Sequence, residues 1–254
     1  MSNILSLCEI SDKDVCHCID DGKTSLSYDT IYLGSEFCWD KLDVGVNWSR
    51  LIGFCHKKGC KAYFVFPILP ERYVDLFREL LVKLNKCGID GVVANDFGVL
   101  YYINQRIPSL PIVIGRLMVK FSRDYVDSHL TNSFRFPQEI IKVCYDFNCI
   151  RIDADYGLLS EEQRNDIDIK IGIHSVSYLT SSMCCDYKFD EKTKFANINT
   201  ICKRNCLKEV VVVPNSPLIK LGNALLYYQS IGDGFATDTI IIDYRCNQLR
   251  TGVL

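Results

Sequence analysis

Short hydrophobic runs rich in Val and Ile alternate along this chain with longer segments whose hydrophobic positions recur at helical spacing. Such runs are typical of strands that are buried on both faces. Strands are predicted at residues 4–10, 30–34, 61–69, 91–96, 111–116, 149–155, 169–179 and 209–214, with a final strand or edge at 239–245. Helices are predicted at residues 48–59, 71–88, 97–106, 137–148 and 219–232.

The segment 71–88 carries the clearest helical pattern. Its hydrophobic positions fall on one face of a helix, and Gly88 stands where a C-cap belongs. Those positions are Val74, Phe77, Leu80, Leu81 and Leu84. The segment 48–59 ends in the same way, at Gly59.

Strands that alternate with helices indicate a parallel sheet covered by helices. The count reaches eight strands at 209–214, and the chain has 254 residues, close to the roughly 250 typical of a (β/α)8 barrel. The predicted fold is therefore a TIM-like α/β barrel, with irregular and incompletely closed forms included. An open doubly wound sheet is the alternative. Residues 1–254 show no linker or repeat, so a single domain is expected.

The composition of the chain limits the kinds of partner and location that can be expected. Hydrophobic residues make up 48% of the chain, so a sizeable core is expected, and the net charge of −2 argues against a nucleic-acid surface. No hydrophobic run is long enough to span a membrane. The N-terminal sequence lacks a basic leader, so a cytoplasmic location is expected.

Fourteen cysteines are many for a cytoplasmic chain. Disulfides are disfavoured in that compartment, so these thiols are expected to be packing residues, metal ligands or reactive groups. Packing is predicted for the cysteines in or beside hydrophobic segments, namely Cys55, Cys60, Cys87, Cys144, Cys149 and Cys246.

The segment 183–206 is different, because its cysteines stand in polar sequence. It contains Cys184, Cys185, Cys202 and Cys206, and Cys38 lies far upstream. Thiolates bind both structural zinc and iron–sulfur clusters. The spacing alone leaves metal ligation and free thiols open, and it does not separate zinc from iron and sulfur.

Polar residues follow several of the predicted strands. Chemistry in parallel α/β folds collects at the carboxyl ends of strands. If the barrel prediction holds, one mouth is shared by Cys38, Asn95, Asp96, Arg116 and Cys184. Helix capping is the alternative role for the Asn-Asp pair, and an ion pair is the alternative for the arginine. Asp153 and Asp155 are expected to cap a strand end.

Four blocks of the sequence resemble the peptidase U-32 (collagenase-like) family, and their layout is most similar to its UbiU/UbiV-type members. The blocks are TIYLGSEFCWDK, GVVANDFGVLYYINQRIPSLPIVIGR, SYLTSSMC followed by the Cys202-x-x-x-Cys206 spacing, and VVVPNSPLIKLGNALLYYQ. The resemblance extends over most of the chain, roughly residues 28–245, and it is loose outside these blocks. The segment LMVKFS after Arg116 departs from the pattern, since it lacks an asparagine found in many relatives.

This resemblance implies a TIM-like barrel and a 4Fe-4S cluster held by Cys38, Cys184, Cys202 and Cys206. Cys184 is preferred to Cys185 because it follows SYLTSS directly. The UbiU/UbiV type implies a heterodimer with a related family member. It also implies oxygen-independent hydroxylation of a small-molecule or quinone-precursor substrate in ubiquinone synthesis, with prephenate as the oxygen donor.

Within that reading, Asn95 and Asp96 would orient a polar substrate and Arg116 would bind a carboxylate. Two other functions remain open: a cluster-bearing or scaffold subunit without chemistry of its own, and a U-32-type peptidase or zinc-stabilised protein. Neither an H-E-x-x-H nor a G-x-S-x-G motif occurs. The four histidines show no sequence pairing that suggests a metal site or a triad.

Overall fold

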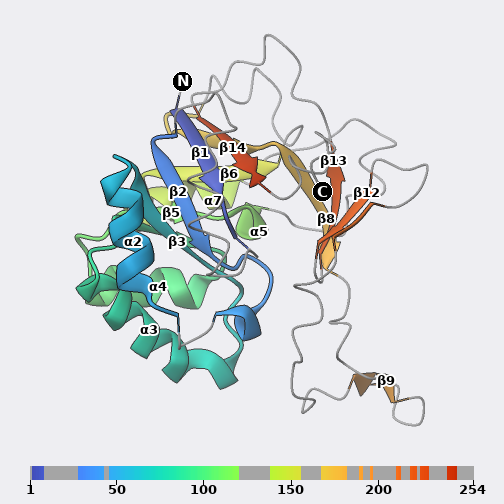
Figure 1. Cartoon of the computed structure of the whole chain (residues 1–254), viewed down its shortest axis with the longest axis horizontal. Coiled ribbons are helices and arrows are strands. Elements are labelled where there is room, and N and C mark those ends of the chain that lie inside the picture. The colour runs from blue at the N-terminus through green and yellow to red at the C-terminus, as the bar shows by residue number, and fades with distance from the viewer. Residues whose placement is uncertain are drawn as a thin grey trace.

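Eight parallel strands form a closed barrel in the computed structural model of the chain (Figure 1). The structure describes residues 2–8, 28–42, 46–119, 138–155, 167–181, 189–190, 195–196, 210–212, 218–221, 224–228 and 239–244. Around the barrel the strands run in the order β1-β14-β7-β6-β5-β4-β3-β2, and each neighbouring pair is parallel. The prediction of a TIM-like α/β barrel is therefore confirmed.

The barrel strands are β1 (Ser2–Ser6), β2 (Thr30–Gly34), β3 (Lys61–Phe66), β4 (Gly91–Ala94), β5 (Ile112–Ile114), β6 (Arg151–Asp155), β7 (Ile171–His174) and β14 (Thr239–Asp243). The helices are η1 (Trp39–Lys41), α2 (Trp48–Lys57), η2 (Glu71–Tyr73), α3 (Val74–Lys86), α4 (Phe97–Arg106), α5 (Arg116–Val119) and α7 (Gln138–Asp146). Outside the barrel lie β8 (Val176–Ser181), β9 (Phe189–Asp190), β10 (Phe195–Ala196), β11 (Val210–Val212), β12 (Leu218–Leu221) and β13 (Ala224–Tyr228).

The outer helices begin at residues that satisfy their first backbone N–H groups. Asn47 accepts a hydrogen bond from Arg50 N at the start of α2, and Asp96 does the same for α4 through Gly98 N and Val99 N. Such caps pair backbone donors that have no partner inside the helix. Both helices begin within a residue of where the sequence predicts them.

Three helices end in the same backbone motif before the next strand. The residue after the C-cap has a positive φ, at Gly59 (75°), Gly88 (81°) and Asn148 (50°). The next N–H then bonds back to a carbonyl five residues earlier, as in the Schellman motif. The three bonds are Cys60 N to Cys55 O (3.0 Å), Ile89 N to Leu84 O (3.3 Å) and Cys149 N to Cys144 O (2.8 Å).

The strands separate two hydrophobic cores. The larger core lies between the barrel and the helices, and it includes Phe64, Phe77 and Leu84, all of them buried. The smaller core fills the barrel, where Ile4, Val65, Val93, Val113 and Ile241 pack with two tyrosines. Inward positions alternate with outward ones along each strand, so every second residue reaches the barrel interior or its mouth.

Cysteine packing is confirmed for the predicted residues that the structure describes. Cys55 and Cys144 are buried in the larger core, and Cys60, Cys87 and Cys149 pack against it. Cys60, Cys87, Cys144 and Cys149 are free thiols. Cys246 lies outside the described residues.

The C-terminal third of the chain departs from the prediction. The predicted strand 169–179 is two strands, because the chain leaves the barrel at Ser175 between β7 and β8. The predicted eighth barrel strand, 209–214, is wrong as a barrel strand: β11 pairs antiparallel with β12 instead. The barrel is closed by β14, which the sequence suggested only as a final strand or edge.

The helix predicted at 219–232 is also wrong. Residues of β12 and β13 pair antiparallel, with Leu221 opposite Ala224. Only Gly222 and Asn223 stand between these two residues, and a Gly-Asn pair between two hydrophobic runs is a hairpin signal. With β8 and β11 these strands form a four-stranded antiparallel sheet, beside the barrel in Figure 1.

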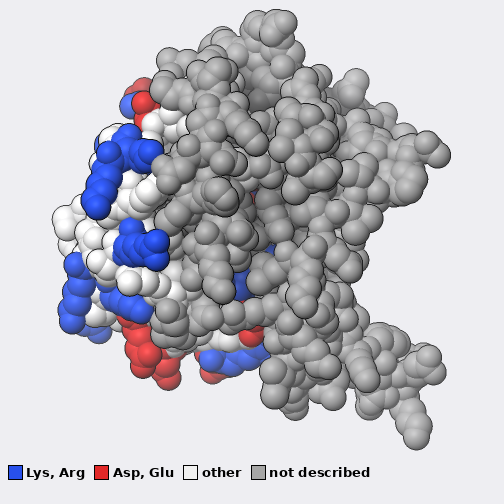
Figure 2. Space-filling model, in the orientation of Figure 1, with Lys and Arg blue, Asp and Glu red and all other residues white. Residues whose placement is uncertain are grey.

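The described outer surface carries both signs of charge. Figure 2 shows Lys and Arg side chains over the helical side of the barrel, with Asp and Glu side chains near α3. None of the helices that the structure describes has the length and apolar character needed to cross a membrane. The single-domain organisation of residues 1–254 stays a prediction.

Candidate functional site

The carboxyl ends of the barrel strands bring five charged or titratable side chains together. Arg116 begins α5 directly after β5, Asp155 ends β6, His174 ends β7 and Asp243 ends β14. Glu36 follows β2 by two residues. We call these five residues the mouth cluster. All of them are buried.

Arg116 is the centre of this cluster. Its Nε donates to Glu36 Oε1 at 2.8 Å and its Nη2 to Glu36 Oε2 at 2.7 Å, so guanidinium and carboxylate meet as a two-pronged fork. Its Nη1 donates to Asp155 Oδ1 at 3.2 Å. The arginine is only 1% exposed. Arg116 thus forms the core ion pair that the sequence left open as an alternative to substrate binding.

Glu36 occupies an environment that opposes its charge. Burial raises the pKa of the Glu36 carboxyl above its ordinary value, while the charges of Arg116 and His174 act to lower it. Arg116 itself stays charged: burial works against the ion, but the charges of Glu36 and Asp155 raise the pKa of the guanidinium. A glutamate whose pKa is raised is suited to gain or lose a proton nearer to neutral pH.

His174 and Asp243 form the second contact of the cluster. His174 Nδ1 lies 3.4 Å from Asp243 Oδ2. Although burial would raise it, the pKa of Asp243 is lowered by the hydrogen bond to His174, the charge of Arg116 and a hydrogen bond from Ser6. Ser6 is also the residue opposite Asp243 in the β1–β14 register. A carboxylate that holds one imidazole nitrogen orients the other nitrogen of the ring.

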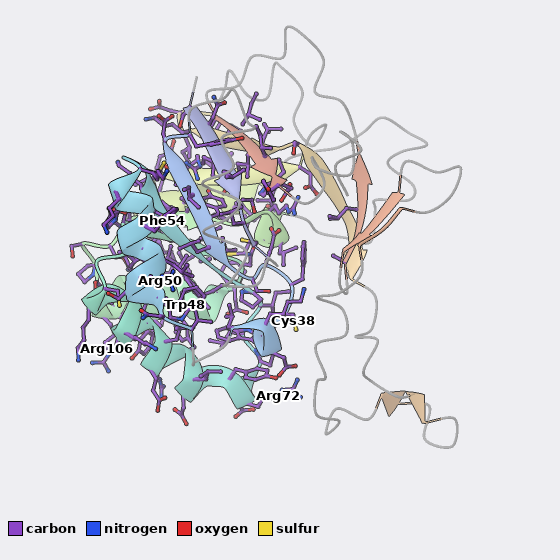
Figure 3. The ribbon with its side chains drawn as sticks, in the orientation of Figure 1. Cys38, Trp48, Arg50, Phe54, Arg72 and Arg106 are labelled. Carbon is purple, nitrogen blue, oxygen red and sulfur yellow. The ribbon has the colours of Figure 1, made fainter. Side chains whose placement is uncertain are left out.

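The loop after β2 connects this cluster to Cys38. Glu36 binds the guanidinium of Arg116, and the next residue, Phe37, places its ring 5.6 Å from the same guanidinium. Cys38 follows, half-buried, beside η1 at the edge of the barrel (Figure 3). Its backbone N–H donates to Ser35 Oγ at 3.2 Å. The predicted ligand therefore lies on the same loop as the main acid of the cluster.

Asn95 and Asp96 lie at the predicted end of β4, but their described contacts are with the backbone. The Asn95 amide donates to Phe66 O at 3.0 Å and accepts from Leu117 N at 3.1 Å. A Cβ at Gly115 would collide with the Asn95 amide, so a glycine is needed there. Asp96 caps α4, the alternative that its sequence position already suggested. Substrate contacts for this pair stay a prediction.

A second polar group lies deeper in the barrel. Asp153 Oδ2 accepts from Tyr32 OH at 2.6 Å, and Asp153 Oδ1 accepts from Arg151 Nε at 2.7 Å. Arg151 also donates to Tyr32 OH. Burial raises the pKa of Tyr32 well above its ordinary value. We call these three residues the inner cluster. Asp153 and Asp155, expected alike to cap a strand end, thus belong to different clusters.

Three of the predicted cluster ligands, Cys184, Cys202 and Cys206, lie outside the described residues, as does Cys185. In sequence they fall between β8 and β11, within the insertion that separates β7 from the closing strand β14. The part of the chain that the structure describes holds no group of three or more His, Cys, Asp or Glu side chains placed to bind a metal ion. The four-cysteine ligand set stays a prediction.

The sequence pattern indicates neither a partner for His174 nor a role for Asp243. Both can be found by one rule: they are the last inward positions of neighbouring barrel strands. To apply that rule, one must know that β7 and β14 are neighbours in the barrel. In sequence, 64 residues stand between His174, where β7 ends, and Thr239, where β14 begins. The sequence shows Glu36 just after a predicted strand, but it does not indicate that Glu36 pairs with Arg116.

Comparison with known proteins supports the resemblance in part. Residues 29–125 match the sequence model of peptidase family U32. Among solved structures, the U32 peptidase Mk0906 is similar with a TM-score of 0.53 and 13% identity, over 95% of this chain and 92% of that chain. A glycerophosphodiester phosphodiesterase from Parabacteroides distasonis ATCC 8503 gives a TM-score of 0.43 and 8% identity, over 68% and 82% of the two chains. No curated protein sequence matches the chain.

The matched segment runs from the residue before β2 to beyond α5, so it contains Glu36, Cys38 and Arg116. At this level of identity, the likeness to Mk0906 concerns the fold. The match of residues 29–125 to the U32 model and the barrel fold support the resemblance. The UbiU/UbiV type stays a prediction.

Proposed function

We propose that this protein is an iron–sulfur protein of the U32 type that supports oxygen-independent hydroxylation of a small polar substrate at the barrel mouth. The observation that carries the proposal is the loop after β2. It lies within the U32-matched segment, it binds Arg116 through Glu36, and it ends in the half-buried thiol of Cys38. Quinone precursors, with prephenate as the oxygen donor, are the substrates that the UbiU/UbiV resemblance favours.

The donor chemistry of Cys38 fits a cluster ligand. Its thiol is half-buried, and it lies beyond the carboxyl end of β2, at the face of the barrel where barrel enzymes place reactive groups. Cys184, Cys202 and Cys206 would complete the set, and thiolates are the usual protein ligands of 4Fe-4S clusters. When bound, such a cluster would supply electrons at the mouth.

The described side chains would handle the substrate and its protons. Arg116 acts as a positioning residue, because its donors already hold Glu36 and Asp155. His174, oriented by Asp243, is the side chain that we propose to hold or deliver a proton at its second ring nitrogen. Imidazole is the side chain most often used for this role. A substrate carboxylate would compete with Asp155, the more distant of the two acids on Arg116.

The test is anaerobic purification followed by iron and acid-labile sulfide analysis. A 4Fe-4S protein should contain about four irons and four sulfides per chain and absorb broadly near 400 nm. Cys38→Ser should lose most of the iron. Cys87→Ser is the matched control, because Cys87 is also half-buried but caps the end of α3 just before β4, away from the carboxyl ends of the strands. Equal iron in both variants would remove Cys38 from the ligand set.

The scaffold alternative is tested with the loaded protein. Prephenate and a candidate acceptor are added with and without a related U32-type partner protein. Hydroxylated product from this chain alone, or from the pair but not from a pair carrying His174→Gln here, assigns chemistry to this subunit. Product that is unaffected by His174→Gln, with iron content intact, assigns it a cluster-bearing role only.

Peptide hydrolysis is the second candidate, and the name of the matched family favours it. The two candidates make different demands on the metal. A zinc-dependent peptidase should purify with zinc in place of iron and sulfide, and it should lose peptide hydrolysis on chelation. Hydrolysis of a mixed peptide library by the purified protein, measured by mass spectrometry, separates it from the iron–sulfur proposal.

A further inference from the structure

Two pairs of cysteines occupy equivalent positions at the ends of α2 and α7. Cys55 and Cys60 span the C-terminal motif of α2, and Cys144 and Cys149 span that of α7. In α3 the same two positions hold Leu84 and Ile89. The side chains at these positions commonly pack against each other in the Schellman motif. The backbone therefore brings two thiols together in each cysteine pair.

In the α7 pair the side chain of the first cysteine is directed at the second residue. The interaction with Cys149 lowers the pKa of Cys144, and the same interaction together with burial raises the pKa of Cys149. Cys144 Sγ also lies 3.4 Å from Cys149 O. Both residues are free thiols. Cys144 is buried and Cys149 is half-buried, and the residue that follows each of them, Tyr145 and Ile150, is exposed.

The α2 pair has the same spacing and backbone but directs its second thiol elsewhere. Cys60 Sγ donates to Tyr28 O at 3.2 Å and to Lys58 O at 3.7 Å. Burial raises the pKa of the Cys60 thiol, and the nearby charge of Asp29 adds to this effect. The α2 pair therefore serves as an internal control for the α7 pair.

We propose that Cys144 and Cys149 form a dithiol modification site that a peroxide or a small-molecule disulfide oxidises selectively to an intramolecular disulfide. The direct backbone hydrogen bond of 2.8 Å between the two residues and the approach of Cys144 Sγ to Cys149 O at 3.4 Å suit a bond whose Cα atoms lie about 4.4–6.8 Å apart. The site is at the helix-to-strand junction before β6, the end of the barrel opposite the mouth cluster. It does not depend on the proposed iron–sulfur function.

The chemistry balances with the oxidant as the electron acceptor. Peroxide oxidises one thiol to a sulfenic acid and releases one water. The second thiol then attacks that sulfur, the S–S bond forms, and the hydroxyl leaves with the thiol proton as a second water. With a small disulfide as oxidant, two exchange steps give the same bond and two small thiols.

The experiment is oxidation of the anaerobically purified holoprotein with low peroxide or oxidised glutathione, followed by alkylation in denaturant and tryptic mass spectrometry. The peptide Val143–Arg151 contains both thiols of the α7 pair and no other cysteine. After oxidation this peptide should be lighter by two hydrogens and should no longer be alkylated. Its oxidation should be roughly tenfold or more faster than that of the α2 pair, since exchange rates follow thiolate fraction and access. Cys149→Ser should leave Cys144 alkylated.

Oxidation in urea provides the control for sequence spacing. Both pairs are separated by four residues, so in the unfolded chain they should oxidise at similar rates, and the selectivity should appear only in the folded protein. Equal rates for the two pairs in the folded protein would overturn the proposal. So would full alkylation of Val143–Arg151 after oxidant treatment that converts both pairs in urea.

Discussion

The barrel contains two buried arginine clusters that are built differently. In the inner cluster one arginine faces one carboxylate, Asp153, and the phenol of Tyr32 donates to the same acid. In the mouth cluster one arginine and one histidine face three carboxylates, those of Glu36, Asp155 and Asp243. The inner cluster is balanced in charge, and the mouth cluster has an excess of acids.

The position of each cluster explains this difference. The inner residues all belong to strands β2 and β6, whereas the mouth residues come from strand ends, the loop after β2 and the start of α5. In a group whose charges balance and whose residues all lie on strands, every charge is paired when the barrel folds. A group with surplus acid depends on protons, or on a bound cationic partner, for its charge balance. We infer that the inner cluster serves stability and the mouth cluster serves function.

The largest expected effect comes from Arg116→Met. The substitution leaves both Glu36 and Asp155 buried without the guanidinium, and breaking a buried ion pair costs about 3–5 kcal/mol of unfolding free energy. Urea denaturation at neutral pH measures it. Arg106→Met is the control, because Arg106 is exposed on α4 (Figure 3) and should change stability by less than about 0.5 kcal/mol.

A double variant sharpens that result. Adding Glu36→Gln to Arg116→Met removes one of the two stranded charges, so it should restore part of the lost stability. If the double variant is no more stable than Arg116→Met alone, then Glu36 is not a stranded charge and the description of the mouth cluster is wrong.

The inner cluster should respond to Arg151→Met with a smaller loss. Asp153 keeps the hydrogen bond from Tyr32 after the arginine is removed, so we expect the lower end of the range for a broken buried pair, about 3 kcal/mol. The iron content of the folded variant should equal that of the wild type. A variant that stays as stable as the wild type but loses iron would reverse the roles assigned to the two clusters.

Tyr32→Phe makes the smallest change to the inner cluster. It removes the phenol hydroxyl, which donates to Asp153 and accepts from Arg151, while the ring stays in place. A lost hydrogen bond to a charged group costs about 1.5–3 kcal/mol, and thermal or urea unfolding measures it. Tyr63→Phe is the matched control, because Tyr63 is a buried barrel tyrosine stacked on Tyr32 at a ring distance of 6.3 Å.

The sequence predicts the barrel well between residues 30 and 155, because each predicted strand from 30–34 to 111–116 is followed by a predicted helix before the next strand begins. Gly59 and Gly88 mark the ends of two of those helices. It fails after His174, where the chain leaves the barrel, forms an antiparallel sheet and returns as β14. A hydrophobic run such as 209–214 has the same composition in either sheet, so only pairing partners distant in sequence decide between them.

The site shows the same division. Cys38 and Arg116 are predictable because Cys38 lies four residues after one predicted strand and Arg116 is the last residue of another. The Glu36–Arg116 fork and the His174–Asp243 contact could not be found, since they join residues 80 and 69 positions apart in sequence. Nor could the sequence separate Asp153 from Asp155, because which cluster an inward residue joins depends on its height in the barrel.

Opposite pH responses of two mouth carboxylates give the finest test of the comparison. The folded pKa of Glu36 is raised above its unfolded value, so its contribution to stability is present at low pH and is lost as pH rises above about 4.5 through the folded pKa. The folded pKa of Asp243 is lowered, so its contribution is present above about pH 3.8 and is lost as pH falls below that value.

Urea midpoints between about pH 3 and pH 8 should therefore decline less with rising pH in Glu36→Gln than in the wild type, and less with falling pH in Asp243→Asn. Glu139→Gln, at an exposed position on α7, should follow the wild-type curve. If Glu36→Gln and Glu139→Gln give the same curve, Glu36 does not hold its proton more tightly in the fold, and the mouth cluster would be as static in its charge as the inner one.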